Sequence, residues 1–187
     1  GCSHKCDTGG CSMCNYEDYS EESEEMTVLR ERAPRLHAEI ITTAVKDNAP
    51  VKGKPLELFS LYNAFDDRET PPEVIDQLFR TLPESIRHAN CYILEVRAKD
   101  ITREKLRAVK AVLPEGAALE LEVGVEAPEW IRNYWINKDL SNDELRGAIE
   151  LVHEEGCGIS TNVLLGIPGL TEEQNVTTYK RTVHQLN

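Results

Sequence analysis

The chain has 187 residues, of which 40% are hydrophobic, and it carries a formal net charge of −12. This length and composition suffice for one hydrophobic core, so we expect a single domain. The sequence shows neither a secretion signal nor an apolar run of roughly 18 to 20 residues, which excludes a membrane-spanning helix and predicts a cytoplasmic protein. The acidic balance argues against a broad nucleic-acid-binding surface, which would need a stripe of Lys and Arg.

The amino terminus concentrates the cysteines, since four of the six fall within residues 1–16: Cys2, Cys6, Cys11 and Cys14. Because cytosolic thiols stay reduced, this cluster predicts a metal site rather than disulfides. Zinc would take all four thiolates, with His4 in reserve. An iron–sulfur cluster also takes thiolates, and three of them can leave one iron open for chemistry. The rest of the chain contains no second C-x2-C pair of the kind that zinc ribbons use, which favours iron–sulfur.

The segment after the cysteines is acidic. Residues 17–26 contain six carboxylates and no basic side chain, a pattern typical of a solvated, flexible loop. We therefore divide the chain into a cluster-binding loop at 1–16, this acidic loop, and a folded part at 27–187. Because no initiator Met precedes the cysteine loop and the chain ends within a predicted helix, we expect a fragment of a longer protein.

Helical and strand patterns alternate in the folded part. Apolar spacing, capping residues and short apolar runs predict helices at 27–49 (begun or kinked by Pro34), from 70, at 102–113, from 141 and from 171, and strands at 56–61, 91–96, 118–123 and 157–165. Strands that alternate with helices in this way form β-α-β units. The pattern therefore predicts an α/β protein with a parallel sheet, whose functional residues gather at the carboxyl ends of the strands.

Several polar or turn-forming residues lie near these predicted strand ends: Asn63, Glu95, Glu126, Lys138, Asn162 and Gly166. Each has a structural alternative when it is taken alone. Glu95 can pair with Arg97, Glu126 can cap a helix that begins near Pro128, and Lys138 can be an ordinary surface lysine. Gly166-Ile-Pro-Gly169 can be a plain turn. The trio Trp130, Tyr134 and Trp135 predicts helix packing, with substrate stacking as the alternative.

The cysteine loop resembles the cluster loop of radical S-adenosylmethionine (SAM) enzymes. The matching residues are Gly1-Cys2 followed by Gly9-Gly10-Cys11-x-x-Cys14-x-Tyr16. This widened spacing is similar to that of the branch that contains the archaeosine-forming enzyme and the catalytic subunit of Elongator. The resemblance implies that Cys2, Cys11 and Cys14 hold a [4Fe–4S] cluster. Cys6 departs from the pattern and is either a spare thiol or a substitute ligand.

The strand-end segments resemble the same branch, in the same order along the chain. The resemblance implies that these residues bind SAM: Asn63 at its amine, Glu95 at its ribose, Glu126 at the nucleoside, Lys138 at its carboxylate, and Asn162 with Gly166 behind its adenine. It covers nearly the whole chain. The fold that it implies is a partial (β/α)6 TIM-like barrel with parallel strands, in which the first strand and the last β/α unit are absent.

The function that the resemblance implies is reductive cleavage of SAM to a 5′-deoxyadenosyl radical, which abstracts hydrogen from a substrate. An electron donor is then a necessary partner. The branch implies tRNA modification, although the acidity of this chain leaves a small molecule or peptide as a competing substrate. Two alternatives lie outside this class: a non-catalytic zinc module, and an iron–sulfur protein that only transfers electrons.

Overall fold

A computed structural model describes residues 2–14, 24–47, 56–58, 63–81, 87 and 89–186. Its centre is a parallel sheet of four strands in the order β1-β2-β3-β4. The strands are β1 (Leu56–Leu58), β2 (Cys91–Val96), β3 (Ala118–Glu126) and β4 (Gly158–Val163). The predicted α/β class and parallel sheet are therefore confirmed. Among the described residues the sheet is open, because β1 and β4 lie at its opposite edges.

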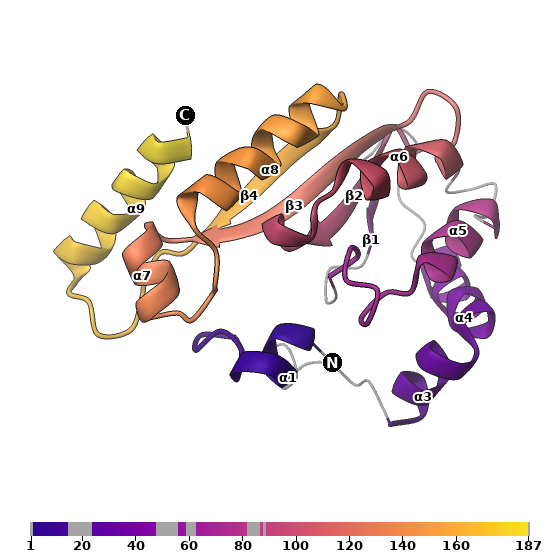
Figure 1. Cartoon of the computed structure of the whole chain (residues 1–187), viewed down its shortest axis with the longest axis horizontal. Coiled ribbons are helices and arrows are strands. Elements are labelled where there is room, and N and C mark those ends of the chain that lie inside the picture. Colours follow the sequence, from indigo (N-terminus) through magenta and orange to yellow (C-terminus); the bar gives the residue numbers. More distant parts are fainter. Residues whose placement is uncertain are drawn as a thin grey trace.

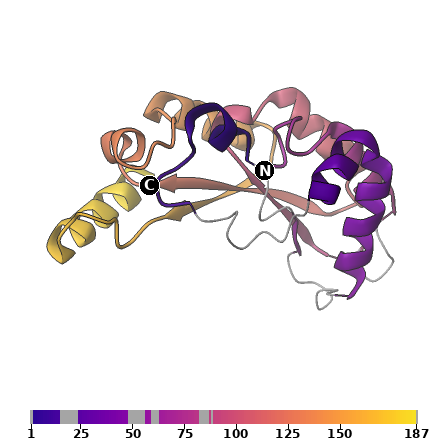
Figure 2. The same cartoon turned by 90° about the horizontal axis from the view of Figure 1, so that it is seen from below.

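The helices lie before, between and after the strands: α1 (Ser3–Thr8), α3 (Glu24–Arg32), α4 (Pro34–Asp47), α5 (Pro72–Thr81), the short 3-10 helix η1 (Ala98–Asp100), α6 (Arg103–Val112), α7 (Glu129–Tyr134), α8 (Asn142–Glu154) and α9 (Glu172–Leu186). Figure 1 shows α6 and α8 above the strands and α1 below them. In Figure 2, seen from below, the indigo segment with α1 is again separate from the violet helices α3 and α4 and from α5.

Predicted capping residues begin three of these helices. The Thr102 hydroxyl accepts a hydrogen bond from the Lys105 N–H at the start of α6. Ser141 and Glu144 form a reciprocal capping box at α8. Thr171 and Gln174 form the same pair of hydrogen bonds at the start of α9. These bonds satisfy backbone N–H groups that the first turn of a helix leaves without partners. Local sequence therefore determines where these helices begin.

Other boundaries differ from the prediction. The helix predicted at 27–49 is two helices, because Pro34 begins α4 and Ala33 separates it from α3. The acidic loop predicted at 17–26 is wrong for residues 24–26, which are the first residues of α3, and its other residues lie outside the described ranges. Residues 59–61 of the first predicted strand also lie outside them. The cysteine loop contains a helix, α1, that its sequence did not predict.

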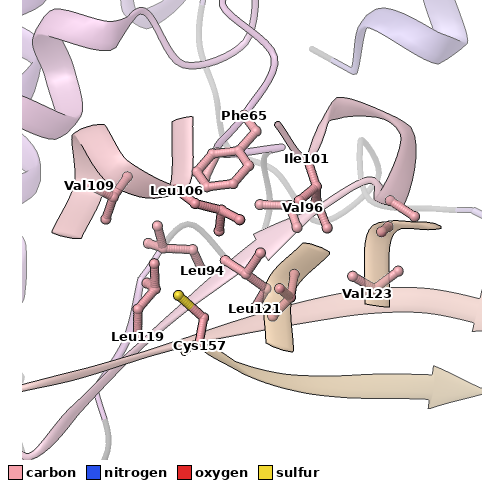
Figure 3. Close-up of a cluster of buried hydrophobic side chains, with 14 of the residues drawn as sticks. Phe65, Leu94, Val96, Ile101, Leu106, Val109, Leu119, Leu121, Val123 and Cys157 are labelled. Atoms are coloured by element: carbon pink, nitrogen blue, oxygen red, sulfur yellow. The ribbon is translucent and has the colours of Figure 1, made fainter. Parts of the chain in front are cut away.

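The main core lies on one face of the sheet, where alternate residues of β2 and β3 pack against α6 and α8. Leu94, Leu121 and Val123 from the strands contact Leu106 and its neighbours from the helices (Figure 3). Cys157 is buried in the same cluster, as expected for a small apolar side chain. The intervening residues of β2 and β3 are less buried and include Glu95, Glu120 and Glu122 beside Ile93, so the other face of the sheet is more polar.

Substitution of Leu121 tests this assignment of the core, because its side chain is 0% exposed at the centre of β3. We expect Leu121→Ala to lower the free energy of unfolding by about 3 kcal/mol, through lost burial and the cavity that remains. Urea unfolding followed by circular dichroism measures the change. The control is Leu165→Ala, which truncates the same side chain at a position that is 66% exposed. Equal losses in the two variants would contradict this assignment of the core.

Candidate functional site

The cysteine loop docks against the turn that follows α7. The Ser12 N–H donates to the carbonyl oxygen of Ile136 over 2.8 Å. The Asn137 amide donates to the carbonyl oxygen of Gly10, also over 2.8 Å, and the buried His4 ring donates from Nε2 to the carbonyl oxygen of Asn137 over 2.6 Å. These bonds join residues more than 120 positions apart. They place the loop beside the segment that leaves the carboxyl end of β3.

A second anchor connects the loop to the segment that follows β1. Glu69, whose side chain is buried, accepts the N–H of Ser3 at Oε1 over 2.7 Å and the N–H of Asn63 at Oε2 over 2.9 Å. The Ser3 hydroxyl also donates to Asp66. One carboxylate therefore holds the residue next to Cys2 and the residue predicted at the first strand end. The loop thus reaches from the β1 side of the sheet to the β3 side.

A small second core completes the attachment. Its buried members are Ala127, Ile131, Ile136 and Ile167, and the partly buried Cys11, Met13, Leu164 and Leu170 pack against it. This cluster joins the cysteine loop to α7 and to the segment that follows β4. Gly169 is required there, because its φ is +85° and a Cβ at this position would lie 2.9 Å from Cζ2 of Trp135.

The thiols themselves differ in exposure. Cys2 and Cys11 are partly buried, whereas Cys6 and Cys14 are exposed. Burial raises the pKa of the Cys11 thiol; Lys138 and Arg97 oppose this rise, while Cys14 and Cys2 add to it. Burial also raises the pKa of Cys2, with Glu69 adding to the rise. Cys2 and Cys14 therefore each lie within electrostatic reach of Cys11, as do the cations Lys138 and Arg97.

The two candidate metal groups, zinc and an iron–sulfur cluster, require different arrangements of thiolates. Within the described ranges, no three or more His, Cys, Asp and Glu side chains converge on a point where they could bind one metal ion. A closed zinc site needs four ligands at about 2.0–2.3 Å from one ion. An iron–sulfur cubane binds each thiolate at a different iron, so its ligands stand farther apart. In either kind of site, Lys138 and Arg97 would offset the negative charge of the thiolates near Cys11.

Lys138 and Glu126 form a mostly buried ion pair near Cys11, with Nζ 2.9 Å from Oε1. Glu126 ends β3 in a left-handed conformation, with φ of 66°. Asn137 and Asp139, on either side of Lys138, are also left-handed, with φ of 59° and 54°. Asn and Asp adopt this conformation readily, but for a residue such as Glu126 it is uncommon, and such positions cluster at functional sites. Gly124 leaves room for the pair, because a Cβ there would overlap both charged groups.

The end of β2 is tied to the same turn. The Arg97 guanidinium donates to the carbonyl oxygen of Lys138 over 3.2 Å, and Lys99 pairs with Asp139. Arg97 also places its charge near both Cys2 and Cys11. The sequence indicates Arg97 only as a partner for Glu95 and does not predict its place beside the thiols.

Asn63 and Gly166 are two further residues that the sequence predicts for the site. The Asn63 side chain links two strand ends, because Nδ2 donates to Asp100 over 2.5 Å and Oδ1 accepts the N–H groups of Phe65 and Arg97. Its amide is thus engaged within the protein. Gly166, with φ of 102°, is exposed and has nothing near its Cβ direction.

Two other predicted residues lie on the polar face of the sheet. Glu95 of β2 is in register with Glu122 of β3, and Asn162 of β4 donates to Glu122 over 2.7 Å. Asn162 is also in register with Gly124, over which the Lys138–Glu126 pair lies. Asn162 therefore borders the ion pair.

Sequence inspection missed Glu69 and Asn137, which anchor the cysteine loop. Neither stands in a motif. Their partners lie 66 and more than 120 residues away, at Ser3 and in residues 4–10, so no local spacing could have indicated them. The only available signals were a carboxylate within the polar segment after the first predicted strand and an amide directly before Lys138.

Fold and site together define a parallel α/β protein that carries a thiol-rich loop across the carboxyl ends of its strands. A comparison with models of protein families finds no match. The chain is similar to the uncharacterized protein MJ0550 of Methanocaldococcus jannaschii, with 28% identity over 171 residues. The match covers 90% of this chain and 45% of the relative, so the chain spans less than half of that protein. In the described part of the chain, no helix has the length and apolar character to cross a membrane.

Proposed function

We propose that this chain is part of a radical SAM enzyme, in which Cys2, Cys11 and Cys14 hold a [4Fe–4S] cluster. The observation that carries the proposal is the grouping of these three thiols with Arg97 and Lys138 at the carboxyl edge of a parallel sheet. When bound, the cluster would supply the electron that cleaves SAM, so that a 5′-deoxyadenosyl radical abstracts hydrogen from the substrate. An electron donor is an implied partner.

The residues around the thiols have the chemistry to bind SAM. Lys138 offers an ammonium group for its carboxylate, and Glu126 offers an acceptor for its nucleoside. These two side chains pair with each other in the unliganded protein, so SAM would exchange one ion pair for two interactions. Glu95 and Asn162 would contribute from the polar face of the sheet, and Gly166 from the turn after β4. Asn63 would act mainly by positioning Arg97, since its amide is already engaged.

The fold that we propose for the whole protein is a (β/α)6 TIM-like barrel, of which this chain supplies a part. The open four-stranded parallel sheet is compatible with that architecture, and its polar face would line the barrel interior. In parallel barrels the carboxyl ends of the strands carry the site. The cysteine loop and the Lys138 turn lie at those ends, which supports the proposal.

The support for a particular class of substrate is less direct than the support for the cluster. We propose tRNA modification on the family resemblance, with a small molecule or peptide as the competing substrate. Because the chain carries a net charge of −12, an RNA substrate would be bound largely by other parts of the protein. The alternative of a structural zinc module would take all four loop thiolates, Cys6 included. A protein that only transfers electrons would leave the Lys138–Glu126 pair without a role.

Anaerobic reconstitution with iron and sulfide tests this function. We expect the reduced protein to give the electron paramagnetic resonance signal of a [4Fe–4S] cluster, and this signal to change when SAM is added. Lys138→Ala should weaken the effect of SAM by about tenfold in concentration, the usual scale for losing one charge-assisted contact. Lys180→Ala, on the exposed side of α9, is the matched control. A signal that ignores SAM would contradict the enzyme and favour electron transfer.

A further inference from the structure

A hollow of about 420 Å³ lies between α7 and α9, apart from the cysteine loop. Trp130 and Tyr134 line it from α7, and Arg181 and Gln185 line it from α9. Both views draw these two helices side by side (Figures 1 and 2). None of the residues that line the hollow belongs to the site proposed for SAM. Its volume is within the range of small-molecule pockets in proteins.

The aromatic side of the hollow is unusually exposed. Trp130 is 52% exposed and Tyr134 is 91% exposed. Because the two residues are four positions apart in α7, their side chains lie on one face of the helix. The predicted role of these residues in helix packing is therefore wrong for Tyr134 and incomplete for Trp130. Exposed rings of this kind provide flat apolar surfaces on which another planar ring can stack.

The opposite side offers polar groups that are not engaged. In the described part of the chain, the side chains of Arg181, Gln185, Trp130 and Tyr134 form no hydrogen bond or ion pair. The other polar groups of the hollow are engaged: the Asn133 amide bonds to both backbone groups of Leu140, and the Glu129 carboxylate, on the α7 side, accepts the N–H of Asn142. Arg181 therefore presents a guanidinium group to the hollow, and Gln185 presents an amide one turn further along α9.

We propose that this hollow binds a nucleoside monophosphate, whose base stacks on Trp130 and Tyr134 and whose phosphate is bound by Arg181. A planar ring with one anionic group matches the two halves of the hollow, since guanidinium binds phosphate through paired hydrogen bonds. Gln185 can hydrogen-bond the edge of the base. The net charge of −12 favours a free nucleotide over a nucleic-acid strand, because each added phosphate meets further repulsion. This inference is independent of the proposed SAM chemistry.

The chain offers a direct reporter for this site, because it contains two tryptophans, Trp130 and Trp135. In the Trp135→Phe variant, the fluorescence arises from Trp130 alone. We expect adenosine monophosphate to quench it to saturation. Arg181→Ala should weaken the binding of adenosine monophosphate by about tenfold, as should removal of the phosphate from the ligand. Adenosine itself should bind the parent and the Arg181→Ala variant equally.

Lys180→Ala is the matched control, because it removes one positive charge from the neighbouring position of α9, outside the hollow. It should leave the affinity for adenosine monophosphate unchanged, and circular dichroism should show each variant folded. Absence of saturable quenching, or equal weakening by Lys180→Ala and Arg181→Ala, would overturn the proposal. A single-stranded tetraadenylate serves as a second ligand at 150 mM salt. Tighter, Arg181-dependent binding of this strand would overturn the choice of a free nucleotide.

Discussion

Replacing Cys2, Cys11 or Cys14 with alanine is expected to lower the affinity for the reconstituted cluster by at least about tenfold, since the loss of residues that merely support metal ligands already costs 10- to 100-fold. Cys6→Ala should retain the cluster. The physical reason is the environment of the thiols: Cys2 and Cys14 act electrostatically on Cys11, and Lys138 and Arg97 offset their charge. Cys6 is exposed on α1.

Iron and sulfide bound per chain, measured after anaerobic reconstitution and desalting, provide the readout. Cys91→Ala controls for the general loss of a thiol, because Cys91 lies on β2 outside the loop. If Cys6→Ala empties the site as completely as Cys11→Ala does, Cys6 is a ligand and the proposed triplet is wrong. Zinc bound with equal dependence on all four loop cysteines would instead support the structural module.

Glu69→Ala is expected to release the cysteine loop and to lower the free energy of unfolding by about 3 kcal/mol, because it leaves the N–H groups of Ser3 and Asn63 without their acceptor. Glu69→Gln should cost less, since its remaining carbonyl oxygen can accept one of the two bonds. Urea unfolding measures both effects. Glu115→Ala removes the same charge from an exposed turn and should change stability by less than about 0.5 kcal/mol.

The reactivity of Cys2 gives this prediction a local readout. Burial raises the pKa of the Cys2 thiol, and the charge of Glu69 raises it further. Losing the carboxylate and opening the loop both lower this pKa, so more of the reactive thiolate is present near pH 8. We therefore expect faster alkylation of Cys2 by iodoacetamide in Glu69→Ala than in Glu115→Ala, as measured by mass spectrometry. Equal rates would show that Glu69 does not hold the loop.

Local patterns predicted the elements well where the signal was short-range. The strand at 91–96 was predicted with its observed bounds, and Thr102 and Ser141 cap the helices that follow them. Period-two burial in β2 and helical spacing in α6 and α8 are local consequences of backbone geometry. Helical spacing also accounts for the buried face of α5, where Val74, Ile75, Leu78 and Phe79 are all buried. The parallel direction of the strands followed from the alternation of strands and helices, whereas their order in the sheet did not.

The exposure of single side chains could not be predicted in this way. Ile131 occupies the buried face of α7, so the rings of Trp130 and Tyr134 on the same helix are exposed to solvent. The left-handed conformation of Glu126 carries no sequence signature either, whereas Asn137 and Asp139 are of residue types that adopt this conformation more readily. Their conformation is imposed by bonds to distant segments, such as those from Asn137 to Gly10 and from Arg97 to Lys138.

The sequence by itself determined the α/β class, the helix starts and the concentration of thiols in one loop, because these depend on residues within a few positions of one another. Tertiary structure decided which thiols become neighbours and which charges face them. It did so through Glu69 and Asn137, whose hydrogen bonds join segments 66 and more than 120 residues apart. Contacts at that separation depend on the packing of β1, β2 and β3 side by side.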